Sequence, residues 1–196
     1  MNTTRVRSKA SVSQDVEVPA PVGYALFDTT IGRCGIAWGE RGIVGLLLPE
    51  ATDGGMRARL QHRFPAGTEA APPPEVARAV EGITALLNGD AVDLSDVELD
   101  MEGVPAFHRR VYEVVRAIPP GGTMSYGEVA AWAGAPGAAR AVGQALGNNP
   151  FAIVVPCHRV LAAGGRIGGF SANGGITTKR RLLAIEGTEV KGAPAA

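Results

Sequence analysis

The stretch that decides the fold is residues 123–150, TMSYGEVAAWAGAPGAARAVGQALGNNP. Thr123 or Ser125 can cap a first helix, which we expect to end where Gly, Ala and Pro follow one another at 134–136. A second helix is predicted over 137–146, and Gly-Asn-Asn-Pro stops it. Two short helices joined by a short turn that contains glycine are typical of a helix-turn-helix.

The second predicted helix carries mostly small side chains. Ala139, Ala141 and Gly143 surround Arg140, which is its one long charged residue. A helix with such a face can approach a DNA groove closely, and it can equally pack tightly against another helix. The spacing alone leaves both interpretations open.

The residues around this stretch complete a mostly helical second half. Residues 105–118, PAFHRRVYEVVRAI, place apolar side chains at helical spacing. We predict a helix there that ends at the Pro-Pro-Gly-Gly of 119–122.

The first half opens on three short runs with the composition of β-strands, at 22–28, 35–38 and 42–48. Gly and Asp/Thr turns separate these runs, as strands linked by hairpins require. Two helical stretches follow, one that starts near Asp53 and one over Pro74–Asn88. This pattern predicts an α/β domain with a small antiparallel sheet and helices.

We place the domain boundary near residues 95–104. The predicted organisation is a disordered tail over 1–20, an N-terminal α/β domain over 21–100, a mostly helical C-terminal domain over 101–187, and a flexible tail over 188–196.

The composition is that of a globular protein, with 45% hydrophobic and 19% charged residues in a chain of 196. The N-terminus lacks the apolar region of a signal peptide, and no window approaches the roughly 18 apolar residues of a membrane span. Cys34 and Cys157 lie far apart, so they indicate free thiols in a reducing compartment. We therefore expect a cytoplasmic protein that does not bind a membrane.

Charge is distributed unevenly although the net charge is zero. Residues 1–103 carry 9 Lys and Arg against 15 Asp and Glu, a net of −6, and residues 104–196 carry 10 against 4, a net of +6. The asymmetry suggests that the second half meets a polyanion. Chance patterning in a two-part protein is the alternative.

The candidate for chemistry lies at residues 153–160, IVVPCHRV. A cysteine becomes a strong nucleophile when a neighbouring base or cation favours its thiolate, and His158 follows Cys157 directly. Adjacent residues of a strand point to opposite faces, so this pairing needs a sharp turn after Pro156 or a bridging water. The residues alone leave a nucleophilic Cys157 and a buried structural cysteine equally open.

The motif PCHRV, preceded by GNNP and by SYGEVA and AARAVG, resembles the O6-alkylguanine-DNA alkyltransferases. The match runs across roughly residues 100–187, and IGRCGIAWGERGIVGLLLPE resembles the family's N-terminal domain more weakly. The resemblance implies a ribonuclease-H-like N-terminal domain and a winged-helix-like C-terminal domain. It also implies transfer of an alkyl group from O6 of guanine in double-stranded DNA to a cysteine, once per molecule.

The resemblance also implies roles for single residues. Cys157 is similar to the alkyl acceptor, His158 to the base that draws the thiol proton through a water, and Glu186 to the acid that orients the histidine. Asn149 resembles the residue that braces the active-site turn, and Tyr126 the tyrosine that contacts the target nucleotide.

Further positions match the DNA-binding face and the guanine pocket of the family. Arg140 resembles the finger that fills the space left by an extruded base, and Ala139, Ala141, Gly143 and Arg159 are expected beside it on the DNA. The expected pocket residues are Val160, Ser171, Phe170 and Pro156.

The assignment agrees with the chemistry of the reaction. O6 of guanine lies inside the base stack, so the nucleotide has to leave the duplex before a thiol reaches it, at a cost of a few kcal/mol. A helix face of Ala and Gly with one Arg suits a minor-groove protein that ignores sequence, because it lacks a row of Asn, Gln and Arg for major-groove reading.

Some features depart from the family or have simpler interpretations. Phe170 stands where many members have Tyr, and the loop FSANGGITTK is about two residues longer than usual. The Cys and His spacing gives no metal site, so we expect neither metal nor cofactor. We predict Cys34, Trp38 and Trp132 in the core, His62 and His108 on the surface, and TKRRLL at 178–183 as a solvated helix face or a phosphate contact.

Three other functions compete with alkyl transfer. A Cys-His hydrolase would need an oxyanion hole, of which the sequence gives no sign. A non-enzymatic helix-turn-helix relative that binds the lesion and recruits repair factors characteristically lacks the cysteine, which is present here as Cys157. A transcriptional regulator that uses the helix pair would leave Cys157 unexplained. We expect a monomer.

Overall fold

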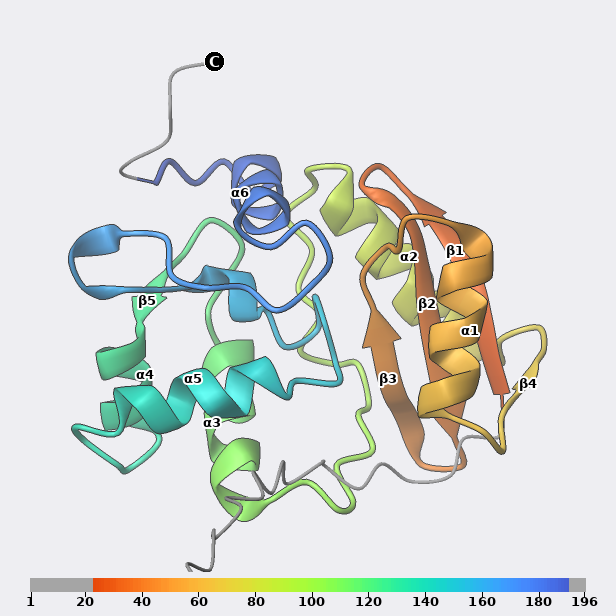
Figure 1. Ribbon diagram of the computed structural model, residues 1–196, viewed down its shortest axis with the longest axis horizontal. Helices are drawn as coiled ribbons and strands as arrows, with labels where there is room; N and C mark the ends of the chain where they lie inside the picture. Colours follow the sequence, from red (N-terminus) through yellow and green to blue (C-terminus); the bar gives the residue numbers. More distant parts are fainter. Residues whose placement is uncertain (1–22, 191–196) are drawn as a thin grey trace, which may run out of the picture.

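The computed structural model describes residues 23–190. The tail predicted over 1–20 lies outside the described residues, as does all but 188–190 of the tail predicted at the C-terminus. Figure 1 shows the chain as two parts side by side, with the sheet and its helices from the first half beside the helical second half.

The sheet of the first half has the strand order β3-β2-β1-β4. Strands β1 (Gly23–Thr29), β2 (Gly32–Gly39) and β3 (Gly42–Leu47) are antiparallel neighbours, as predicted. The short strand β4 (Thr68–Glu69) pairs parallel to β1, so the sheet is mixed and the predicted antiparallel pairing holds for β1, β2 and β3 but not for β4. A strand of two residues is too short to leave a periodic signal in the sequence.

Two helices cover the two faces of this sheet (Figure 1). Helix α1 (Asp53–Arg63), capped by the Thr52 hydroxyl, packs on β2 and forms a separate apolar cluster with one face of the sheet. Helix α2 (Pro74–Leu87) packs on the opposite face, where Ile36 and Trp38 join the main core. Gly45 is required under α1, because a Cβ there would lie 2.3 Å from the Phe64 ring.

The second half is mostly helical and contains the predicted helix-turn-helix. Helices α4 (Tyr126–Trp132) and α5 (Ala139–Gly147) meet across a short connection, and Ser125 caps α4 in a capping box with Glu128. The elements of this half are α3 (Ala106–Arg116), β5 (Met124–Ser125), α4 (Tyr126–Trp132), α5 (Ala139–Gly147), η1 (Cys157–Arg159), β6 (Val160–Leu161), η2 (Ala163–Gly165) and α6 (Ile176–Ile185).

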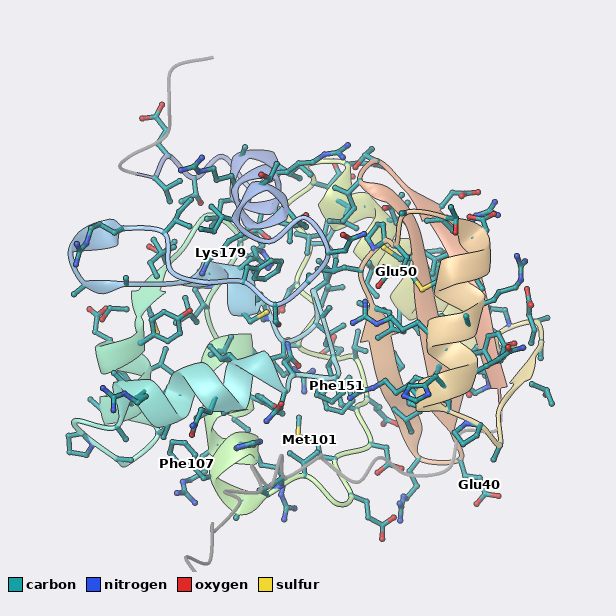
Figure 2. All side chains as sticks on the ribbon, in the orientation of Figure 1. Glu40, Glu50, Met101, Phe107, Phe151 and Lys179 are labelled. Atoms are coloured by element: carbon teal, nitrogen blue, oxygen red, sulfur yellow. The ribbon has the colours of Figure 1, made fainter. Side chains whose placement is uncertain are left out.

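One apolar core runs through both halves, and Phe151 lies at their junction. Its side chain is fully buried, and Figure 2 labels it between β3 and the second half. On either side of Phe151, Leu46 of β3 donates from its N–H to the Pro150 carbonyl at 2.8 Å and accepts from the Ala152 N–H at 3.2 Å. The chain that leads into PCHRV is therefore fixed to the edge of the sheet.

Two predictions about buried and exposed residues are wrong. Trp132, predicted in the core, is 76% exposed at the end of α4, because the apolar stripe of that short helix falls on Val129 and Ala130 instead. Lys179, predicted on a solvated or phosphate-contacting face, is 0% exposed. Trp38 and Cys34 are buried as predicted. Within residues 23–190, no helix has the length and apolar character needed to cross a membrane.

Candidate active site around Cys157

The loop before Cys157 is held in an irregular conformation by Asn149. The Asn149 side chain donates to the Val155 carbonyl at 2.9 Å and accepts from the Phe151 N–H at 2.9 Å. Between them, Ile153 adopts φ 69°, a conformation that costs a β-branched residue free energy. One amide thus fixes both ends of the loop and offsets the strain within it.

The backbone then turns into the 3-10 helix η1, Cys157–Arg159. This is the sharp turn that the sequence required if Cys157 and His158 were to act together. Burial raises the pKa of the Cys157 thiol, whereas a hydrogen bond from Asn149 and the positive charge of Lys179 lower it. The thiol rests protonated among groups that stabilise its anion.

His158, Glu186 and Arg159 form a buried ionic cluster. Glu186 Oε1 lies 2.9 Å from His158 Nε2 and 2.8 Å from an Arg159 guanidinium nitrogen, and Glu186 Oε2 accepts from Arg159 Nε at 2.9 Å. The His158 and Glu186 side chains are only 1% and 4% exposed. A carboxylate accepts hydrogen bonds and cannot donate them, so the proton of a neutral His158 sits on Nε2 and leaves Nδ1 as an acceptor.

The charges of this cluster follow from its burial. Burial lowers the pKa of His158, while Glu186 acts in the opposite direction. Burial alone would raise the pKa of Glu186, but hydrogen bonds from His158 and Arg159, together with the positive charge of Arg159, bring it down to about 2. The carboxylate therefore stays ionised, and His158 is a neutral base at physiological pH.

Lys179 is a site residue that the sequence analysis missed. Its ammonium donates to the Val160 carbonyl at 2.5 Å and lies 5.8 Å from the centre of the Tyr126 ring. Figure 2 labels it close to the loop that runs under α6. Burial lowers the pKa of Lys179, and Cys157 raises it. The run TKRRLL hid this role, because nothing in it distinguishes a buried cation from the solvated ones beside it.

A cavity of about 380 Å³ lies against Cys157 on the side of the helix-turn-helix. Its lining residues are Tyr126, Gly143, Leu146, Gly147, Cys157, Gly169, Phe170 and Ser171. The Tyr126 ring packs so closely on Gly168 that a Cβ there would lie 2.9 Å from it. Burial raises the pKa of Tyr126, and the anionic form of Cys157 raises it further, so the hydroxyl stays protonated.

A second cavity, of about 510 Å³, reaches Cys157 from the side of the sheet. Apolar residues of β3 and basic residues of α1 line it together with Asn149 and Phe170. The two cavities share Leu146, Gly147, Cys157, Phe170 and Ser171. The sulfur thus stands at the boundary between two hollows.

The outer face of α5 carries the residues predicted to meet DNA. Arg140 is exposed, and Ala139, Ala141 and Gly143 are half-buried beside it. Val142, Ala145 and Leu146 form the buried side of the helix. The face is small and uncharged except for Arg140, which leaves room for a close approach.

The structure corrects one predicted site residue. Arg159 is 5% exposed and its guanidinium is occupied by Glu186 and by the Ile118 carbonyl, so it cannot contact DNA. Pro156 and Val160 are buried on either side of η1, and their place in the guanine pocket stays a prediction. Leu146, Gly147 and Gly169, which the sequence analysis did not name, also line the cavity beside Tyr126.

The other thiol and the other histidines have no comparable setting. Cys34 is fully buried, and burial raises its pKa to about 12. His62 is exposed, as predicted, while His108 is half-buried. In the part of the chain that the structure describes, no group of three or more Cys, His, Asp and Glu is arranged to hold a metal ion.

Comparison with known proteins matches the second half to one family model. Residues 106–188 fit the model described as "6-O-methylguanine DNA methyltransferase, DNA binding domain". A methylated-DNA–protein-cysteine methyltransferase of Methanothermobacter thermautotrophicus is 36% identical over 81% of this chain and 81% of its own. A protein of the same name from Mycolicibacterium paratuberculosis is 51% identical over 58% of this chain and 67% of its own.

Solved structures give the same likeness for the whole fold. The crystal structure of Mycobacterium tuberculosis OGT in complex with DNA superposes with a TM-score of 0.67 at 40% identity. The match covers 84% of this chain and 92% of that one.

A Glu186→Gln substitution tests the buried cluster through stability. The pKa of Glu186 is lowered from 4.5 to about 2 in the folded chain, so its contribution to the free energy of unfolding is present above pH 4.5 and lost as pH falls towards 2. We expect the free energy of unfolding of the variant to be lower by on the order of 3 kcal/mol at pH 7, the size of a broken buried pair. Urea unfolding at a series of pH values should show the difference between wild type and variant becoming smaller below pH 4.5. A difference that does not depend on pH would contradict the ionised cluster.

A Lys179→Met substitution tests the cation beside the thiol. Without the ammonium the Cys157 thiolate loses stabilisation, so the pH midpoint of its alkylation by iodoacetamide should rise and the rate at pH 7.5 should fall several-fold. Lys179→Arg keeps the charge and serves as the control. Since Cys34 is buried, the label reports on Cys157. An unchanged pH midpoint in the methionine variant would show that Lys179 does not stabilise the Cys157 thiolate.

Proposed function

Since the chain belongs to the methylated-DNA–protein-cysteine methyltransferase family, we propose that it repairs DNA by moving the alkyl group of O6-alkylguanine onto Cys157, one group per molecule. The observation that carries this proposal is the setting of Cys157. The thiol adjoins the cavity at the helix-turn-helix. Its surroundings include a neutral His158, which is hydrogen-bonded to Glu186, and the buried ammonium of Lys179.

The damaged nucleotide has to leave the duplex to reach the sulfur. The cavity beside Tyr126, about 380 Å³, is within the range of small-molecule pockets, and it opens beside α5. In the proposed complex the small face of α5 enters the minor groove, and Arg140 fills the place of the extruded base. The net charge of +6 over residues 104–196 attracts the phosphate backbone.

The proposed transfer begins with the thiol proton, which passes through a water to Nδ1 of His158. The thiolate attacks the alkyl carbon, an S–C bond forms, and the C–O6 bond breaks with its electron pair moving to the guanine. Tyr126 donates its hydroxyl proton to the departing base. The proton that His158 took from the thiol then returns to Tyr126, which restores both groups. The positive charge of Lys179 stabilises the sulfur anion on the way.

The reaction stops after one transfer, because an alkyl thioether is a poor electrophile whose S–C bond water does not cleave at neutral pH. The finer expectations belong to this proposal as well: a monomer, a cytoplasmic location, a ribonuclease-H-like N-terminal domain and a winged-helix-like C-terminal domain that divide near residue 100.

The direct test is incubation of the protein with a duplex that carries O6-[³H]methylguanine. We expect label on the protein up to one methyl per chain, none with Cys157→Ser, and full labelling with Cys34→Ser as the matched cysteine control. Repeated turnover, or label retained by Cys157→Ser, would rule out the proposed acceptor. Tight duplex binding without any transfer would favour the non-enzymatic alternative.

An Arg140→Ala substitution tests the proposed wedge. Filling the vacated stack offsets part of an unstacking cost of a few kcal/mol, so repair of the duplex should slow by roughly 10- to 100-fold. Transfer from free O6-benzylguanine needs no flipping and should change little. Arg109→Ala, an exposed arginine of α3, is the control for charge alone. Equal losses on duplex and free base would contradict the wedge.

A further inference from the structure

The cavity between α1 and Cys157 has a distinct charge. Arg59, His62 and Arg63 line it from α1, and none of its lining residues is Asp or Glu. Its remaining walls are apolar or neutral and include Leu46, Leu47 and Ala152. The hollow therefore combines an apolar surface near the sulfur with a cationic wall opposite.

The position of this cavity relates it to the transferred group. The sulfur lies on the boundary that both cavities share. In the proposed function the guanine occupies the cavity of Tyr126, and in-line attack places the alkyl carbon between O6 and the sulfur. A substituent longer than methyl then has the second cavity beside it, because the first is filled by the base.

We propose that the cationic wall of α1 makes this protein prefer O6-alkylguanines whose alkyl group ends in an anion, such as a carboxylate. This inference rests on the proposed function and adds a substrate class to it. A carboxylate entering the hollow meets arginine donors, and hydrogen bonds between ionised groups are roughly twice as strong as those between neutral groups. The apolar residues near the sulfur pack against the neutral part of the same group.

Both arginines already have neighbours within the chain, and these limit how strongly the wall can favour an anion. Arg59 forms an ion pair with Glu50, and both side chains are partly exposed, so part of its charge is already balanced. Arg63 lies over the Phe64 ring, with 5.9 Å between the guanidinium carbon and the ring centre. We therefore expect a modest preference, to which both arginines contribute.

The chemistry of transfer is unchanged by the anion. The S–C bond forms, the C–O6 bond breaks, the guanine receives the electron pair and then a proton, and the carboxylate is a spectator. The preference appears as a faster transfer of the anionic group and not as a different product.

The experiment compares O6-benzylguanine, O6-(4-carboxybenzyl)guanine and O6-(4-aminomethylbenzyl)guanine, which share one shape and differ in charge. Transfer to Cys157 is followed by intact mass, both from the free bases and from duplexes that carry the same adducts. We expect the carboxylate to react roughly fivefold faster than the neutral benzyl group, and the ammonium to react more slowly.

Variants of α1 locate the preference. Arg63→Gln should reduce the carboxybenzyl-to-benzyl ratio, and Arg59→Gln with Arg63→Gln should bring it close to one. Arg57→Gln is the matched control, since Arg57 lies on the same helix, pairs with Glu69 and does not line the cavity. A ratio near one in the wild type, or a ratio that survives the double substitution, would overturn the preference.

Two further measurements distinguish a failure of the proposed function from a failure of the anion preference. Transfer from O6-methylguanine in a duplex is measured on the same preparations, so its failure overturns the proposed function, whereas its success with a ratio of one overturns only the preference. Affinity for undamaged duplex is measured by fluorescence anisotropy. A loss of affinity in the double variant that accounts for its slower reaction would assign the cations to DNA phosphate and would also overturn the preference.

Discussion

The buried carboxylate of Glu186 is the interaction on which the site depends. Removing a carboxylate from water is costly unless it is paired, and here His158 and Arg159 pair it within one short turn. Arg159 also donates to the Ile118 carbonyl beyond the end of α3. One side chain after α6 therefore fixes η1, sets the tautomer of the base and ties three separate segments together.

The opposite side of the site depends on the sheet. The backbone of Leu46 in β3 holds the chain on either side of Phe151, and Asn149 spans the loop from there to Val155. The strained φ of Ile153 persists because these contacts determine the loop from both ends. The first half thus contributes to the reactive thiol without supplying a group to its chemistry, and it also supplies the α1 wall of the second cavity.

The sequence predicted those parts of the molecule whose signals are local. The capping residue Ser125 and the Gly-Ala-Pro turn predicted the helix-turn-helix, and runs of strand-like composition separated by Gly and Asp/Thr turns predicted the hairpins of the sheet. The pairing of His158 with Glu186 came only from family resemblance, because 28 residues separate them. Lys179 and Arg159 were placed wrongly, since a charged residue type does not reveal whether a distant carbonyl or carboxylate compensates its burial. Trp132 was placed wrongly because its aromatic type suggested the core, whereas α4 buries Val129 and Ala130.

The central claim is that His158 is a neutral imidazole with its proton on Nε2 and a free acceptor at Nδ1. Nitrogen-15 NMR of the histidine side chains measures this directly, with His158→Gln to assign the signal among the three histidines of the chain. At pH 7 we predict a protonated Nε2 and an unprotonated Nδ1 for His158, and in Glu186→Gln a weaker preference for that tautomer. An imidazolium, or a proton on Nδ1, at neutral pH would contradict the account.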